Sequence, residues 1–182
     1  MPQQPTIWTV GHSTRSIAEF TDLLRAHEIA LLVDVRAIPR SRYNPQFNAD
    51  TLSKSLKEAG LVYLHKPALG GLRKPGKDSM NIGWRNDSFR GYADYMQTGE
   101  FWQALEELMR HGRQGPTAIM CAEAVPWRCH RSLIADALVS RGWDIRHIMS
   151  PEKATLHVLT PFAHFENGTL TYPKPNDPPS LF

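Results

Sequence analysis

Short, mostly apolar segments occur along the chain, and the segments between them carry apolar residues at helical spacing. They cover residues 7–10, 30–35, 61–64 and 117–121, and residues 143–148, which mix apolar and polar positions, are predicted as a fifth strand. An apolar run of this length is typical of a parallel strand that is buried on both faces. Strands that alternate with helices predict an α/β fold, here a Rossmann-like three-layer domain with a mostly parallel five-stranded sheet.

Local signals mark the ends of the predicted helices. Ser16 and Glu19 have the spacing of a capping box, and the apolar residues after them continue at helical spacing. Gly60 and Gly142 each follow a helical segment and are expected to end it. The other predicted helices cover residues 49–59, 89–96 and 101–109, and a segment that begins near Cys129.

The end of the chain departs from the α/β pattern. Asn167 and Gly168 separate residues 162–166 from residues 169–172, and this dipeptide is the strongest short-range signal of a β-hairpin. The sequence therefore adds a small C-terminal β-hairpin to the predicted domain.

One domain is expected over residues 1–172, with the hairpin in its segment 150–172. Residues 173–182 are Pro-rich and predict an extended tail. Residues 72–88 have no periodicity and are longer than most connections, so we expect a lid-like basic loop there.

The distribution of charged residues indicates which class of ligand the protein binds. The chain has 182 residues and a formal net charge of +3. Residues 73–90 hold five basic and two acidic side chains, and residues 35–49 hold Arg36, Arg40 and Arg42 without an acid. Such segments favour a small anionic ligand or a nucleic acid, although a solvated basic loop has the same composition.

Composition also predicts a cytoplasmic protein without a membrane partner. No apolar run approaches the roughly 18 residues of a membrane-spanning helix, and no signal peptide is visible at the N-terminus. Two cysteines are too few for a disulfide scaffold, which favours a reducing compartment. The oligomeric state is not specified by these features.

Reactive residues gather after the fourth predicted strand. Cys121 ends that strand, Glu123 lies in the following turn, and Cys129, His130 and Arg131 begin the next helix. In an open α/β sheet, ligands bind where the carboxyl ends of strands meet helix N-termini, because unpaired N–H groups favour anions there. The sequence therefore predicts the functional site at this junction.

Polar motifs also follow the other predicted strands, so parallel strands would bring them to the same edge. The predicted catalytic residues, which can hold a proton or attack a substrate, are Asp34, Glu123, Cys129 and His130. The predicted substrate-binding residues, which are polar, basic or in a Gly-Gly turn, are His12, Ser13, Arg36, Arg42, Gly70, Gly71 and Arg131. No metal ligand and no cofactor is assigned.

Several interpretations of the two cysteines remain open. Six residues separate Cys121 from Arg128, one more than in a tyrosine-phosphatase loop. Cys121, Cys129 and His130 offer three metal ligands at a spacing unusual for zinc, with His12 as a candidate fourth. The cysteines could instead form a redox pair, or Cys121 could be a core residue and Cys129 a thiol of lowered pKa.

The two acids at strand ends also have two interpretations. Asp34 and Glu123 lie among arginines, and salt bridges such as one between Asp34 and Arg131 would hold loops together. Alternatively, one acid is a general base beside arginines that bind an anion. A lone Gly11 after the first strand is not a dinucleotide-binding fingerprint, so the fold alone does not imply such a cofactor.

The order of these motifs resembles the bacterial and archaeal family described as domain of unknown function 488. The resemblance covers roughly residues 6–172 and is carried by Val10-Gly-His-Ser, Asp34-Val-Arg-x-x-Pro-x-Ser-Arg, Pro45-x-Phe-Asn, Leu69-Gly-Gly, Met120-Cys-Ala-Glu, Cys129-His-Arg and His147-Ile. It implies a compact α/β domain and supplies no reaction.

Function must therefore be argued from the site. The first hypothesis is an enzyme acting on an anionic ligand that contains phosphate or derives from nucleic acid. The alternatives are a non-catalytic nucleotide-binding or nucleic-acid-binding module and a thiol- or metal-dependent redox protein.

Overall fold

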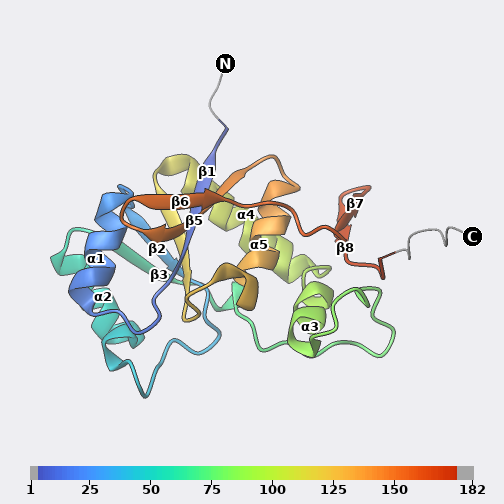
Figure 1. Cartoon of the computed structure of the whole chain (residues 1–182), viewed down its shortest axis with the longest axis horizontal. Helices are drawn as coiled ribbons and strands as arrows, with labels where there is room; N and C mark the ends of the chain where they lie inside the picture. Colours follow the sequence, from blue (N-terminus) through green and yellow to red (C-terminus); the bar gives the residue numbers. More distant parts are fainter. Residues whose placement is uncertain (1–3, 176–182) are drawn as a thin grey trace, which may run out of the picture.

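A six-stranded sheet forms the centre of the protein, whose residues 4–175 are described by a computed structural model (Figure 1). Five strands are parallel, as the sequence predicts, in the order β3-β2-β4-β1-β5. In chain order they are β1 (Thr6–Gly11), β2 (Leu31–Asp34), β3 (Val62–His65), β4 (Thr117–Cys121) and β5 (Asp144–Ser150). The predicted α/β class is confirmed.

The sixth strand is one that the apolar pattern does not predict. β6 (Lys153–Leu156) pairs antiparallel with β5 at the edge of the sheet. Three of its four residues are exposed, so it has no apolar run of the kind that marks the buried parallel strands. The sheet is therefore mostly parallel, with one antiparallel edge strand.

Helices cover both faces of the sheet and give the domain three layers (Figure 1). In chain order they are α1 (Ile17–Ala26), α2 (Ala49–Glu58), α3 (Asp87–Tyr95), α4 (Gly99–Gln114) and α5 (Arg131–Val139). α1 and α2 share one core with Met120 of β4, whereas α3, α4 and α5 share the other with Ile119. Because β4 is buried on both faces, its sequence is an unbroken apolar run.

The helix ends follow the predicted signals. The hydroxyl of Ser16 accepts a hydrogen bond from the Glu19 amide, and the Glu19 carboxylate accepts one from the Ser16 amide, which completes the capping box. Gly60 and Gly142 adopt φ values of +80° and +82° just beyond α2 and α5. None of the helices in the described part of the chain is both long and apolar enough to cross a membrane.

The predicted hairpin is confirmed. β7 (His164–Glu166) and β8 (Thr169–Thr171) pair antiparallel, and Asn167 and Gly168 between them have φ values of 50° and 79°. Positive φ at both turn residues is the type I′ conformation that suits the strand twist. Leu170 attaches the hairpin to the core that α5 shares. Most of the predicted tail, residues 176–182, lies outside the described residues.

The long loop before α3 is attached to that helix. The carboxylate of Asp94 accepts hydrogen bonds from the Gly76 amide, the Ser79 hydroxyl and the Asn81 side chain, at 2.8, 2.6 and 2.7 Å. The Asn81 side chain in turn accepts a hydrogen bond from the Tyr172 amide after the hairpin. These contacts explain how an irregular loop is held without regular structure, and the lid role stays a prediction.

Close packing at the end of β1 leads to a stability prediction. A Cβ added to Gly11 would lie 1.8 Å from the backbone oxygen of Glu123, so the turn after β4 would have to move. Gly11→Ala should lower the free energy of unfolding by about 1–3 kcal/mol, as overpacking does. Gly99→Ala is the control, because its added Cβ meets no atom within 4 Å. Equal stabilities in chemical denaturation would contradict the close approach.

Candidate functional site

A hollow of ≈ 270 Å³ lies at the carboxyl edge of the parallel strands. Its walls come from the segments that follow β1, β2 and β4, from the Gly-Gly turn and from the start of α5. The polar and reactive side chains that line it are His12, Arg36, Arg40, Ser41, Cys121 and His130. A mostly apolar hollow of ≈ 380 Å³ lies at the opposite end, near Leu31, Val62 and Thr117, away from these groups.

Two thiols and an imidazole meet at the floor of this hollow. The reactive atoms of Cys121, Cys129 and His130 all lie within 4.8 Å of one another. Both cysteines are free and buried. His130 Nε2 lies 2.9 Å from the backbone oxygen of Val35, to which it donates, so Nδ1 keeps its lone pair and lies 3.7 Å from Cys129 Sγ.

The two thiols differ in their acidity. The hydrogen bond from Cys121 lowers the pKa of Cys129 to about 7, and the positive charge and backbone N–H of Arg131 act in the same direction. Donating that hydrogen bond, together with burial, raises the pKa of Cys121 to about 12. Without a bound ion, the first proton of the pair therefore leaves Cys129.

Asp34 and Arg36 form a buried ion pair. Arg36 donates to both carboxylate oxygens, from Nε at 2.9 Å and Nη2 at 2.7 Å, and the Tyr63 hydroxyl donates at 2.6 Å. Asp34 is fully buried, and it does not line the hollow. The expected pair between Asp34 and Arg131 is wrong, because Arg36 reaches the carboxylate from two residues away.

The imidazole ring of His12 is neutral and is fixed by two hydrogen bonds and one stacking contact. Nδ1 donates to the backbone oxygen of Ser13 at 2.8 Å, Nε2 accepts from Arg36 Nη1 at 3.4 Å, and the ring stacks on Phe47 with centroids 4.2 Å apart. Burial lowers the pKa of His12 to about 4. Ser13 continues the backbone pairing with the segment after β4, through a hydrogen bond to Ala122, and does not line the hollow.

Arg131 and Glu123 contact each other through the backbone. The buried Arg131 guanidinium donates from Nη2 to the Glu123 carbonyl oxygen at 2.7 Å and from Nη1 to the Thr9 hydroxyl at 3.2 Å. The Glu123 residue is exposed, and neither residue lines the hollow. Arg131 thus fixes the turn after β4, and the predicted ligand-binding and acid–base roles of this pair stay predictions.

Of the remaining predicted binding residues, one lines the hollow and the others do not. Gly71 lines the hollow, where an added Cβ would lie 3.1 Å from His130 Nδ1, whereas Gly70 packs against the Ala37 backbone. Arg40 lines the hollow and Arg42 does not. Arg40 is absent from the predicted site, since two arginines in one basic loop carry the same sequence signal.

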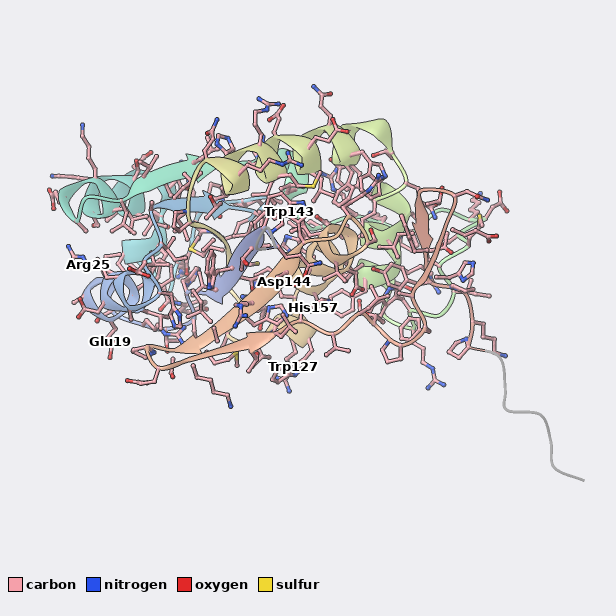
Figure 2. The ribbon with its side chains drawn as sticks, turned by 90° about the horizontal axis from the view of Figure 1, so that it is seen from above. Glu19, Arg25, Trp127, Trp143, Asp144 and His157 are labelled. Atoms are coloured by element: carbon pink, nitrogen blue, oxygen red, sulfur yellow. The ribbon has the colours of Figure 1, made fainter. Side chains whose placement is uncertain are left out.

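A buried chain of hydrogen bonds connects the start of α5 to the C-terminal segment. Arg131 donates to Thr9, whose hydroxyl lies 2.7 Å from His147 Nδ1. His147 Nε2 lies 2.9 Å from His157 Nδ1, and His157 Nε2 lies 2.7 Å from Asp136. One set of neutral tautomers, each ring with its proton on Nε2, gives every contact from Thr9 to Asp136 one donor and one acceptor, while the buried Nε of Arg131 has no partner in the described part of the chain. Figure 2 shows His157 beside the orange ribbon of β5 and β6.

Comparison with known proteins identifies one family. The family model described as "Domain of unknown function DUF488" matches residues 16–138, which include the hollow-lining segments after β2 and β4. No curated protein and no solved structure matches the chain.

Two buried histidines predict how stability depends on pH. Burial lowers the pKa of His12 to about 4 and that of His147 to about 3, against an ordinary value of 6.5. Below about pH 6.5 these histidines are protonated in the unfolded chain but stay neutral in the folded protein. The free energy of unfolding is therefore highest above that pH and decreases as the pH falls toward about 4. We expect a loss on the order of 1 kcal/mol per pH unit for each ring.

Denaturant unfolding at a series of pH values between 7 and 4.5 measures this loss. The charged and titratable groups that act on the rings are Arg36, Asp34 and Arg131 at His12, and His157, Arg131 and Asp136 at His147. An unfolding free energy that stays constant over this range would contradict the neutral, buried state of both rings.

Proposed function

The chain belongs to the DUF488 family, and because that description names no reaction, we propose a function from the site itself: an enzyme that converts a small anionic ligand at the carboxyl edge of the sheet. The ligand contains phosphate or derives from nucleic acid. It occupies the hollow above Cys121 and His130.

The observation that carries this proposal is that Cys121 and His130 of the Cys121–Cys129–His130 cluster line the same hollow as Arg40, a cation without an ion-pair partner among residues 4–175. Arg40 is exposed and lines the hollow, while the Arg36 charge is compensated by Asp34. A module that only binds an anion needs the cation, but it has no need of two buried thiols beside an imidazole. The cluster therefore favours chemistry over binding alone.

The wall offers a second group suited to an anion. The Ser41 hydroxyl accepts a hydrogen bond from the Asn44 amide at 2.9 Å, which leaves its own proton available to a ligand. Ser41 and Arg40 are neighbours in the loop after β2 and both line the hollow. Ile38 and Leu72, which are 63% and 78% exposed, also line it and suit the apolar part of a nucleotide-like ligand.

Arg40 and Arg42 give a matched test of ligand binding. Nucleotides, sugar phosphates and short oligonucleotides are screened for an increase in melting temperature, and the affinity of each hit is measured. Arg40→Ala should weaken binding by about 10–100-fold, because a hydrogen bond between charged groups contributes about 1.5–3 kcal/mol. Arg42→Ala should change affinity less than about threefold, since Arg42 does not line the hollow. Equal losses would place the ligand elsewhere on the basic loop.

Conversion of the bound ligand separates an enzyme from a binding module. Cys121→Ser, which changes the thiol that lines the hollow, should lower the turnover number at least about 100-fold, the lower end of what a group that acts directly on the substrate contributes. Cys129→Ser should lower it too, because Cys129 forms the hydrogen bond with Cys121. Binding by Arg40 should be kept in both variants. Glu123→Gln tests the acid–base role predicted for that exposed residue: a loss of turnover with binding kept would support the role, and full turnover would contradict it. A ligand that binds tightly and that the wild-type protein leaves unchanged would favour the binding module.

A further inference from the structure

We propose that Cys121, Cys129 and His130 bind one zinc ion whose fourth ligand position opens into the hollow. The inference rests on the proposed function for the chemical role of the ion, whereas the ligand geometry stands by itself. Nitrogen and sulfur ligands at about 2.0–2.3 Å from a tetrahedral zinc lie about 3.4–3.8 Å from one another. Cys129 Sγ and His130 Nδ1 are 3.7 Å apart, within this range, and all three ligand atoms lie within 4.8 Å of one another, so the widest pair would have to close by at most about 1 Å around the ion.

Two hydrogen bonds around the cluster orient its nitrogen and sulfur atoms as ligands of a cation. His130 donates its Nε2 proton to the Val35 carbonyl, which turns the Nδ1 lone pair toward the sulfur atoms. Metal-binding histidines commonly donate their other ring N–H to a backbone carbonyl in this way. The backbone N–H of Arg131 points at Cys129 Sγ at 3.4 Å, a contact that stabilises a thiolate ligand.

The protein supplies three ligands and leaves the fourth position free. His12, the fourth ligand considered from the sequence, uses Nδ1 for Ser13 and Nε2 for Arg36. Asp34 is occupied by Arg36 and Tyr63. Gly71 has no side chain beside His130 Nδ1, so space remains on the side of the hollow, which Cys121 and His130 line. Zinc sites that keep an open position beside three protein ligands are typically catalytic.

The donor set selects the ion. Two soft thiolates and one imidazole suit zinc, whereas calcium and magnesium require oxygen ligands. Zinc with two thiolates is neutral overall, so the buried cluster carries no excess charge beside Arg131. When bound, zinc would activate a water molecule or polarise an oxygen of the anionic ligand. Arg40 and Ser41 would orient that ligand from the wall.

Metal titration tests the site without an enzymatic assay. Protein freed of metal with a chelator under reducing conditions is titrated with Zn²⁺, and with Co²⁺ as a spectroscopic probe. We expect one ion per chain and the sulfur-to-cobalt charge-transfer band of thiolate ligation. Cys121→Ser, Cys129→Ser and His130→Gln should each weaken zinc binding at least about 100-fold. His12→Gln is the matched control and should keep one ion, because His12 is not a ligand.

If a cysteine variant fails to fold, the reaction of the wild-type thiols with a thiol reagent tests the same site. In the wild-type protein, zinc should protect both thiols from a thiol reagent, and a chelator should restore their reaction. A folded protein that binds no zinc while both thiols react freely would overturn the proposal. Loss of the ion in His12→Gln with the fold intact would overturn the open fourth position.

The outcome also separates this inference from the proposed function. A protein that binds one zinc ion but converts no ligand retains the metal site and loses the enzymatic role. A protein that binds no zinc and still converts its ligand retains the enzymatic role and loses the metal site.

Discussion

The buried ion pair between Asp34 and Arg36 is the interaction on which the carboxyl edge of the sheet depends. Arg36 joins the end of β2 to the Phe47 carbonyl at 2.7 Å and to His12 at 3.4 Å, while Asp34 accepts the Tyr63 hydroxyl. Removing one member of such a pair leaves an uncompensated buried charge and costs about 3–5 kcal/mol. The pair therefore fixes the loops after β1 and β2 relative to the rest of the sheet.

Most of the charged and polar groups at this edge are engaged in holding the fold. Arg131 fixes the turn after β4 through the Glu123 carbonyl, and it begins the hydrogen-bonded chain that ends at Asp136. The Cys–His cluster differs, because among the described residues the hydrogen bond that Cys129 Sγ accepts from the Arg131 amide is its thiols' link to the surrounding fold, and the Nδ1 of His130 faces Cys129. Reactive groups on a support held by packing and hydrogen bonds are the arrangement that catalysis needs.

The sequence predicts those parts of the fold that depend on burial and local turn chemistry. β4 is visible because both its faces are buried, and the hairpin because Asn167 and Gly168 adopt positive φ. β6 is not visible, since an exposed edge strand has no apolar run. That the motifs meet at one edge follows from the parallel strands, whichever way each side chain points, whereas the roles of the site residues stay predictions.

The sequence does not predict in which direction the side chains at this edge of the sheet point. Asp34 turns to Arg36, the Glu123 residue is exposed, and Arg40 lines the hollow in place of Arg42. These choices depend on the path of each turn, to which residue type and spacing are insensitive. The cluster illustrates the same limit. From the sequence Cys121 is a core residue, and it is the path of the turn of residues 122–128 that brings Cys129 and His130 close to it.

X-ray absorption at the zinc edge tests the central claim, that this cluster is the reactive centre of the hollow, most directly. The account predicts two sulfur ligands at about 2.3 Å and two nitrogen or oxygen ligands at about 2.0–2.1 Å, one of them exchangeable with added ligand. A first shell without sulfur, or one filled by four protein ligands and unchanged by the anion that binds beside Arg40, would contradict it.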